Sequence, residues 1–309
     1  MKVLVLAAAL LSQAPATPPS QAQPQPQATP AVATGKPSAP VVWASLSAQE
    51  RAAFLTGDAV LPLRDRLLRV SERFLGTPYI HSPLGEGSGV DPDPTFRLDA
   101  VDCLTFVEQA MAMSMATSET DVTRVLEGLR YASSPTYEDR NHLMEAQWLP
   151  NNQRKGFVVD VTRRYGGEDT VRVQKTLTPV TWTSRSSLAL GLPKERQPRG
   201  TYTLNMIPLD RVMTHARKVP SGTILVVLRD DLPLKATRVT HLGFVVQKGR
   251  RTWLRHARRG VDGHGRVVDE DLETFLARNA KYDKWKVSGV SLYEPRHPDA
   301  SGGELVRSP

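Results

Sequence analysis

The segment 103–116 is apolar on nearly every side when it is drawn as a helix. Its apolar side chains are Leu104, Phe106, Val107, Ala110, Met111 and Met115. Such a helix is buried, because every face of it would otherwise expose apolar surface to water. Whatever fold the chain adopts must therefore cover this segment on all sides, with its methionines serving as core residues.

The elements around this segment predict the fold class. Ser47 and Glu50 form a capping box that opens a short helix, and a second helix begins at Pro62 and ends before Gly76. The C-terminal half instead contains four strand-like runs, at 223–228, 241–247, 252–256 and 287–293. Helices first and strands later favour an α+β fold with an antiparallel sheet over a doubly wound parallel one.

The N-terminal end of the chain predicts an exported protein. Lys2 precedes a short apolar run, and the small residues Ala14 and Ala16 offer a cleavage site. A stretch rich in Pro, Gln and Ala follows, which cannot bury enough apolar surface to become ordered. The predicted divisions are a signal peptide at 1–16, a disordered linker at 17–44, one folded domain at 45–297 and a flexible tail at 298–309. The expected location is the periplasm or the cell envelope.

The formal net charge of +8 suits an anionic partner. The basic residues are mixed with acidic ones, and no nucleic-acid-binding motif is present. We therefore expect no nucleic-acid partner, and the anionic envelope is the nearer candidate.

No apolar run reaches the ~20 residues that a membrane-spanning helix requires, so no stable membrane span is expected.

Cys103 is the only cysteine of the chain, and it stands where a polar, turn-rich stretch gives way to the apolar helix. Backbone N–H groups and the helix dipole at a helix N-terminus favour the thiolate, which is the nucleophilic form of cysteine. Cys103 is therefore a candidate for covalent catalysis. The alternative is a buried cysteine that acts as a small hydrophobic residue.

Two histidines fall on neighbouring predicted strands. A two-residue hairpin turn at Lys248–Gly249 would connect these strands. In that register His241 lies directly opposite His256 on one face of the sheet. Gly243 would then face Leu254 and leave room for another element to approach, such as the tip of the helix that begins at Cys103.

A cysteine nucleophile needs this arrangement. An imidazole must take the thiol proton and later protonate the leaving amine. A third group must hold that imidazole in the correct tautomer and orientation. The spacing predicts His241 as the base and His256 as the group that orients it.

Four motifs in this order resemble bacterial cell-wall cysteine hydrolases of the NlpC type. The motifs are Gly76-Thr77-Pro78-Tyr79, Asp102-Cys103-Leu104-Thr105-Phe106-Val107-Glu108, Thr240-His241-Leu242-Gly243-Phe244-Val245 and Leu254-Arg255-His256. The Thr-Phe-Val-Glu that follows the cysteine, and the segment 131–148, resemble the N-acetylmuramoyl-L-alanine amidase-like branch. The resemblance implies a papain-like fold, with the catalytic cysteine at a helix N-terminus packed on a C-terminal antiparallel sheet. It also implies peptidoglycan or muropeptide fragments as substrate, and no cofactor.

The resemblance assigns roles by position. Cys103 would be the nucleophile, His241 the base and His256 the third polar residue. The remaining site residues would be Tyr79, which lines the pocket and helps to bind the oxyanion, Asp102, which holds the helix start, and Arg140, which pairs with a muropeptide carboxylate. The branch has His-Tyr after this arginine, whereas this chain has Asn141-His142, so the chain departs from the pattern there.

Several other functions use the same residues. A peptidoglycan stem-peptide endopeptidase would differ only in the amide bond that it cleaves, and acyl transfer would use the same groups. A zinc hydrolase would take Cys103, His241 and either His256 or His264 as ligands, although no familiar zinc-binding spacing is present. A non-catalytic cell-wall binding module could keep the fold without the chemistry.

Overall fold

The computed structural model describes residues 42–260 and 264–298. The predicted signal peptide, the linker up to residue 41 and the tail from residue 299 lie outside the described residues. In the described part of the chain, the strands join one eight-stranded sheet in which every paired strand is antiparallel. The mixed α+β class with an antiparallel sheet is therefore confirmed.

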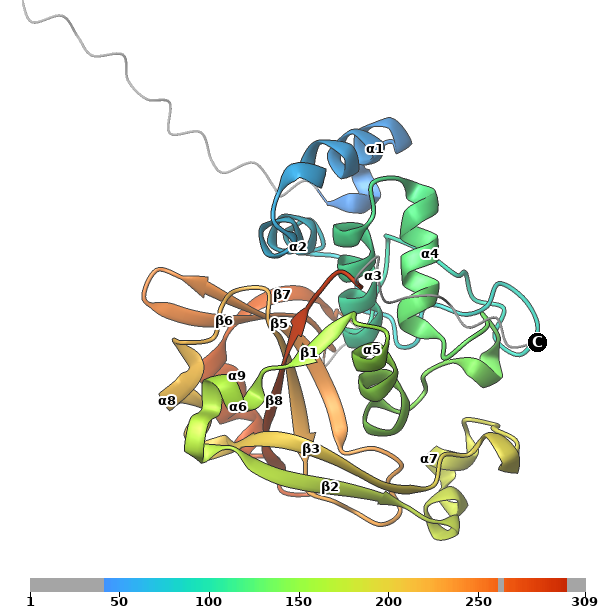
Figure 1. Cartoon of the computed structure of the whole chain (residues 1–309), viewed down its shortest axis with the longest axis vertical. Coiled ribbons are helices and arrows are strands. Elements are labelled where there is room, and N and C mark those ends of the chain that lie inside the picture. Colours follow the sequence, from blue (N-terminus) through green and yellow to red (C-terminus); the bar gives the residue numbers. More distant parts are fainter. Residues whose placement is uncertain (1–41, 261–263, 299–309) are drawn as a thin grey trace, which may run out of the picture. The chain divides into compact units, whose positions relative to one another are not determined.

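The sheet has the order β2-β3-β8-β4-β5-β6-β7, and β1 pairs with β8 outside this path (Figure 1). The strands are β1 (Val158–Asp160), β2 (Val171–Leu177), β3 (Gly200–Pro208), β4 (Ile224–Arg229), β5 (Val239–Lys248), β6 (Arg251–Arg258), β7 (Arg266–Asp271) and β8 (Val287–Pro295). The α-helices are α1 (Ala48–Gly57), α2 (Leu63–Glu72), α3 (Cys103–Met115), α4 (Glu119–Arg130), α5 (Leu149–Arg154), α6 (Thr162–Gly166), α7 (Arg185–Leu188), α8 (Val212–Ala216) and α9 (Leu272–Ala280).

The helix α3 is the buried central helix that the sequence predicts. It begins at Cys103, and every residue from Thr105 to its end is buried. Its first turn is closed by a capping box in which Asp102 accepts from the backbone N–H of Thr105 at 2.8 Å. The ring of Phe106 meets the ring of Phe244 of β5 edge-on, with centroids 5.5 Å apart. Helix α3 is therefore packed directly against the strand that carries His241.

Apolar side chains fill both faces of the sheet. One face packs with the helices α2, α3 and α4, and Leu242 and Phe244 of β5 belong to this core. The other face packs with α8 and α9, and Val245 of β5 and Leu254 of β6 belong to this second core. Because side chains alternate along a strand, consecutive residues of β5 serve different cores.

The folded domain begins slightly earlier than predicted. Trp43 lies within the stretch assigned to the linker, yet its side chain is completely buried. Its indole N–H donates to the carbonyl of Val70 at 2.9 Å, and its ring meets Phe54 edge-on. A linker prediction based on Pro and Gln content extends too far here, because one aromatic residue is enough to attach the segment to the core.

The hairpin between β5 and β6 also differs from the prediction. The observed pairs run from Phe244↔Arg255 to Lys248↔Arg251, so the turn is Gly249–Arg250. Gly249 has a φ of 54°, which is the left-handed conformation that such turns require. The register is therefore shifted by two residues, and His241 and His256 are diagonal neighbours. A shift of two preserves the face, so both histidines remain on the same side of the sheet.

Strands β1, β2, β3 and β7 were not predicted. β2 is mostly exposed, and β7 consists largely of charged residues, so neither has the apolar composition of a core strand. Their pairing with neighbouring strands defines them.

Within the described residues, no helix is long and apolar enough to cross a membrane.

Candidate active site

The structure brings the two predicted histidines together. Nε2 of His241 lies 2.6 Å from Nδ1 of His256, and the two rings are nearly perpendicular with centroids 4.8 Å apart. Both rings also pack against Phe275 of α9, at centroid distances of 5.7 and 5.3 Å. The pair therefore lies on the sheet face that α9 covers.

Gly243 makes this contact possible. A Cβ atom at Gly243 would lie 2.8 Å from Cβ of His256 and 2.5 Å from the carbonyl oxygen of Arg255. The prediction that Gly243 faces Leu254 and admits the helix tip is therefore wrong in its register. The space above this glycine is taken by the backbone of β6 and by His256 itself.

The sulfur of Cys103 reaches the sheet next to His241. The polar groups near the sulfur that lower the pKa of the thiol are the backbone N–H groups of Cys103 and Leu104, at the tip of α3, and of Leu242 in β5. Along a strand, the backbone N–H groups point alternately to the two neighbouring strands. The N–H of Val245 donates to the carbonyl of Thr223, at the start of β4. The N–H of Leu242, three residues earlier in β5, therefore points the other way, towards β6. The pairing between β5 and β6 ends at Phe244, which leaves that N–H free to meet the thiol.

The thiol and the histidines are adjacent, but they are not bonded to each other. Among the hydrogen bonds of the described residues, none joins the Cys103 sulfur to a histidine ring. The sulfur contacts the amide of Leu242, which is the residue after His241. Leu242 faces the core around α3, whereas the His241 ring stacks on Phe275 of α9.

The protonation state of Cys103 differs from the expectation. Burial, together with the nearby carboxylate of Asp102, raises the pKa of the thiol to about 12. The three backbone N–H groups act in the opposite direction but do not outweigh the burial. The resting form is therefore the neutral thiol, although the side chain remains partly exposed. The helix N-terminus alone does not produce a thiolate here.

The histidines are neutral as well. Burial lowers the pKa of His241 well below its ordinary value of 6.5, and the neighbouring His256 and Arg278 lower it further. Burial also lowers the pKa of His256, although the hydrogen bond to Glu270 opposes the shift. At neutral pH the pair can accept a proton, which is what a general base must do.

Tyr79 lies beside the thiol. Burial, with the electrostatic influence of the neighbouring Cys103 and Asp102, raises the pKa of the Tyr79 phenol to about 12. The phenol therefore keeps its proton at neutral pH and remains a hydrogen-bond donor. Its backbone N–H donates to the carbonyl of Gly265 at 2.8 Å, which attaches this segment to the start of β7.

Asp102 is a structural residue of the helix start. One carboxylate oxygen caps α3, and the other accepts from the backbone N–H of Ser82 at 3.0 Å. The carboxylate thereby connects the loop after Tyr79 to the tip of α3. This is the holding role that the sequence suggests for it.

Arg140 is already paired inside the chain. Its guanidinium donates to Glu86 at 2.8 Å and to Asp91 at 3.0 Å, and its side chain is mostly buried. These bonds hold the glycine-rich loop at 85–91. A substrate carboxylate would have to compete with two carboxylates of the chain itself, so pairing with a muropeptide stays a prediction.

Sequence reasoning missed two residues next to the histidines. Glu270 of β7 accepts from Nε2 of His256 at 3.0 Å. Arg278 of α9 donates to both oxygens of the Glu270 carboxylate, at 2.8 Å and 3.0 Å. The sequence carries no signal for them, because the acidic run 269–271 resembles an exposed loop unless β7 is known.

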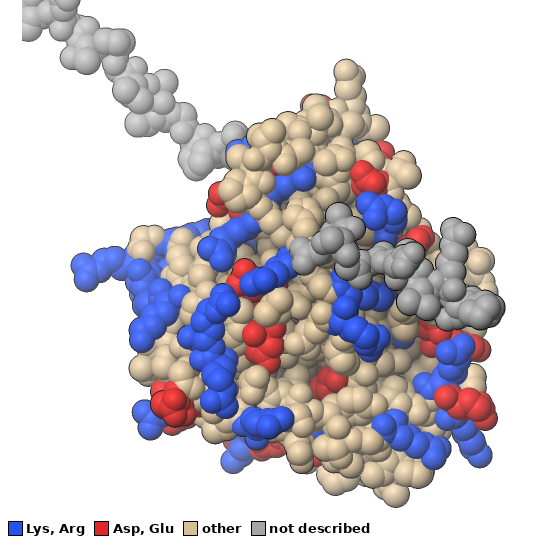
Figure 2. Space-filling model, viewed as in Figure 1, with Lys and Arg blue, Asp and Glu red and all other residues tan. Residues whose placement is uncertain are grey.

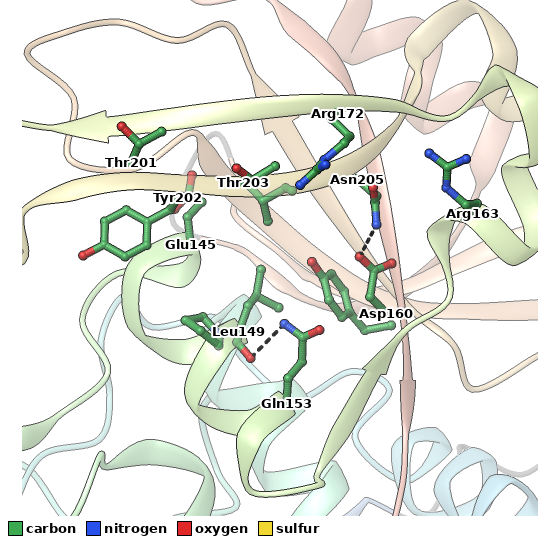
Figure 3. A pocket seen from close by; sticks show the side chains of 13 residues that line it. Glu145, Leu149, Gln153, Asp160, Arg163, Arg172, Thr201, Tyr202, Thr203 and Asn205 are labelled. Atoms are coloured by element: carbon green, nitrogen blue, oxygen red, sulfur yellow. Dashed lines mark hydrogen bonds between the residues drawn. The ribbon is translucent and has the colours of Figure 1, made fainter.

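A separate pocket of about 520 Å³ lies between β1, α5 and the β2–β3 hairpin (Figure 3). Figure 3 shows Asn205 directed towards Asp160, and the two side chains are joined by a hydrogen bond of 2.9 Å. The pocket contains none of the three predicted catalytic residues. Its wall includes Glu145, whose carboxylate accepts from the backbone N–H of Val239 at the start of β5.

The zinc hypothesis requires a cluster of ligands. Within residues 42–260 and 264–298, no group of three or more His, Cys, Asp or Glu side chains is arranged to hold a metal ion.

Lys and Arg side chains are spread over the face shown in Figure 2, with acidic side chains between them. This mixture agrees with the absence of a long basic run in the sequence.

Comparison with known proteins identifies relatives of the chain. A family model described as AmiA-like, N-acetylmuramoyl-L-alanine amidase-like, matches residues 69–282. A search of curated proteins gives no match.

Several solved structures have a similar fold. Protein LPG0564 from Legionella pneumophila, of the DUF1460 family, has a TM-score of 0.69 and 19% identity, with 81% of this chain and 94% of that chain covered. An N-acetylmuramoyl-L-alanine amidase from Bacteroides uniformis has a TM-score of 0.58 and 20% identity, with 76% and 99% covered. A candidate xylanase from Bacteroides fragilis has a TM-score of 0.59 and 22% identity, with 73% and 99% covered.

At these identities the solved structures show a shared fold and not a shared activity. The family match carries more weight, because it covers more than half of the sequence and includes Cys103, His241 and His256. The chain belongs to the N-acetylmuramoyl-L-alanine amidase-like family.

Proposed function

We propose that this protein is an exported cysteine hydrolase that cleaves an amide bond in peptidoglycan or in muropeptide fragments. The bond that fits the family best is the one between the muramoyl lactyl group and L-alanine. Membership of the amidase-like family supports the reaction class. We further propose that the α+β fold is papain-like and of the NlpC type.

One observation carries the mechanism. The Cys103 thiol lies against the amide of Leu242, and the preceding residue, His241, is hydrogen-bonded to His256. The proposed nucleophile therefore lies beside the strand that carries the proposed base, and that base is hydrogen-bonded to the proposed orienting group. This is the order that thiol-based acyl transfer requires.

The chemistry begins from a neutral thiol and a neutral imidazole. As the Cys103 sulfur attacks the carbonyl carbon, its proton passes to His241, and a tetrahedral intermediate forms. Collapse of this intermediate breaks the C–N bond, and His241 returns the proton to the leaving amine. Water then hydrolyses the thioester with His241 again acting as base, which regenerates the thiol.

Charge on the oxyanion needs donors that are already in place. The backbone N–H of Cys103 at the tip of α3 is one candidate, and the Tyr79 phenol is the other. The raised pKa of Tyr79 supports this role, since a phenol that stays protonated can donate throughout the reaction.

The proposed location follows from the sequence. A signal peptide at 1–16 and a linker behind it would deliver the domain to the periplasm or the cell envelope, where peptidoglycan is found. The net charge of +8 would favour association with anionic envelope polymers.

The decisive experiment replaces the nucleophile. In Cys103→Ala and Cys103→Ser, hydrolysis of purified muropeptides should fall by about 10³-fold or more while thermal unfolding is unchanged. His297→Gln, which removes a histidine outside the His241–His256 pair, serves as the control and should hydrolyse at the wild-type rate. Hydrolysis by Cys103→Ala at the wild-type rate would show that the mechanism is wrong.

Product masses separate the two candidate bonds. Release of an intact stem peptide from the sugar indicates the amidase. Release of a shortened peptide indicates the endopeptidase. Products that remain bound to a second amine indicate acyl transfer.

A further inference from the structure

Three strands contribute one polar residue each to the face that α9 covers. His241 lies on β5, His256 on β6 and Glu270 on β7. Leu254 pairs with Glu270 across β6 and β7, and His256 is two residues from Leu254, so Glu270 and His256 share a face. The three side chains thus form a diagonal series of hydrogen bonds. Nε2 of His241 lies 2.6 Å from Nδ1 of His256, and Nε2 of His256 lies 3.0 Å from a carboxylate oxygen of Glu270.

Helix α9 completes this series. Arg278 binds both oxygens of Glu270, and Phe275, one turn earlier on the same helix, packs against both imidazoles. The side chain of His256 is only 1% exposed. Its two ring nitrogens are therefore hydrogen-bonded to His241 and Glu270, and water has little access to them.

The hydrogen-bond partners determine where the protons lie. An ionised carboxylate can only accept, so Nε2 of His256 must carry its proton towards Glu270. In a neutral ring, Nδ1 of His256 is then bare and can only accept. Nε2 of His241, 2.6 Å away, must consequently donate, and Nδ1 of His241 is left bare.

We propose that Glu270, held by Arg278, sets the tautomers of both histidines and thereby leaves Nδ1 of His241 free to take the proton of Cys103. Glu270 is a positioning residue in this arrangement, because it acts through His256 and does not touch the substrate. The proposal rests on the proposed function for the catalytic consequence, but the tautomers themselves do not depend on it.

The electrostatics of the site agree with this assignment. Burial alone would raise the pKa of Glu270, but the hydrogen bonds from His256 and Arg278 and the charge of Arg278 lower it to about 2. Glu270 is therefore a carboxylate at every pH at which the enzyme would work. Both histidines have lowered pKa values, so each carries a single ring proton near neutral pH.

The substitution Glu270→Gln should reverse the donor and the acceptor in each hydrogen bond from residue 270 to His241. Arg278 can only donate, so it will keep the amide oxygen of the new side chain. The amide NH₂ is then presented to Nε2 of His256, which moves the ring proton to Nδ1. Nδ1 of His256 donates to Nε2 of His241, and the proton of His241 moves to Nδ1. The base is then blocked by its own proton.

The test uses the ¹⁵N signals of the histidine rings in the full chain, assigned with single His→Gln variants. In the wild-type protein at neutral pH, Nδ1 of both His241 and His256 should be bare and both Nε2 atoms should be protonated. In Glu270→Gln the pattern should reverse. A protonated Nδ1 on His256 in the wild type would overturn the proposal, whether or not the protein hydrolyses muropeptides.

Kinetics provide the second measurement. Glu270→Gln should lower kcat by roughly 10²- to 10⁴-fold, the contribution typical of a general base, with KM little changed. Glu273→Gln removes one negative charge from an exposed position of the same helix and should stay within twofold of the wild type.

A double variant separates positioning from folding. In Glu270→Gln with Arg278→Met, the amide can rotate and offer its oxygen to His256, so the wild-type tautomers and at least tenfold of the lost kcat should return. If Glu270 were merely structural, the second substitution would reduce activity further. A loss in the double variant equal to or greater than that in Glu270→Gln would therefore overturn the proposal.

Discussion

Nε2 of His241 and Nδ1 of His256 lie 2.6 Å apart, although the two residues are diagonal across the β5–β6 ladder. The contact spans the diagonal because Gly243 has no side chain to separate the strands. Only Nδ1 of His241 then remains to receive a proton from the thiol. Gly243 therefore permits the contact that leaves Nδ1 of His241 as the nitrogen available to act as the base.

Gly243→Ala should disrupt this contact. The added methyl group would lie 2.5 Å from the Arg255 carbonyl and 2.8 Å from Cβ of His256, so β6 must move. We expect a loss of about 1–3 kcal/mol in the free energy of unfolding, measured by denaturant titration, and a larger proportional loss in kcat/KM. Gly57→Ala is the control, because nothing lies within 4 Å of a Cβ there. Equal stability of Gly243→Ala and the wild type would contradict the packing argument.

The pH profile of activity should extend to acidic pH. His241 must be neutral to act as base, and its pKa lies well below 6.5 because of burial and of the neighbouring His256 and Arg278. The charged groups that influence the pair are Glu270, Arg278, Arg229 and Arg258. We therefore expect kcat/KM to hold its plateau below pH 6.5 and to fall only as the pH passes through the lowered histidine pKa. A decline that begins above pH 7 would be incompatible with neutral, buried imidazoles.

Alkylation of Cys103 should be slow near neutral pH. The thiolate is the reactive form, and the pKa of this thiol is about 12. The rate of reaction with iodoacetamide should rise about tenfold per pH unit between pH 7 and 10. A small free thiol, studied in parallel, should level off at lower pH. A rate for Cys103 that is independent of pH would indicate a preformed thiolate–imidazolium pair instead.

Glu108 should make stability depend on pH in an unusual direction. Burial raises its pKa to about 7 from an ordinary 4.5, despite Arg130 and a hydrogen bond from Trp148. The folded state then holds a proton that the unfolded state has released, so this residue reduces stability as the pH rises from about 4.5 to 7. The effect is about 3 kcal/mol at most.

The substitution Glu108→Gln isolates this effect. The free energy of unfolding of the variant, minus that of the wild type, should increase between pH 5 and pH 8. Glu127→Gln, at an exposed position of α4, is the matched control for the loss of a carboxylate from the surface. Parallel curves for Glu108→Gln and the wild type would mean that Glu108 has an ordinary pKa.

The start of the folded domain can be tested by truncation. Removal of residues 1–41 should leave the free energy of unfolding unchanged. Removal of residues 1–45 also removes Trp43, whose buried ring and hydrogen bond to Val70 should be worth about 3 kcal/mol or more. Denaturant titration of the two shortened proteins measures the difference, and equal stability would show that Trp43 is dispensable.

Local patterns were enough to predict the elements that pack in the core. The capping box at Ser47, the all-apolar helix from Cys103 and the strands around His241 and His256 are signals that lie within a few residues of each other. The edge strands β2 and β7 lack such a signal, because β2 is mostly exposed and the carboxylates of β7 are partly buried only through pairing with basic side chains of other elements. The acidic run of β7 therefore concealed Glu270.

The sequence by itself determined that a lone cysteine begins a buried helix, and that two histidines share a face of neighbouring strands. These features depend on side-chain periodicity, which even a register error of two residues preserves. Only the tertiary structure decided which ring nitrogens meet, and that burial leaves the thiol and both imidazoles neutral. It also decided that Glu270 binds His256 and that Arg278 binds Glu270. Distances and desolvation depend on how segments far apart in the chain are packed together, and no local pattern contains that information.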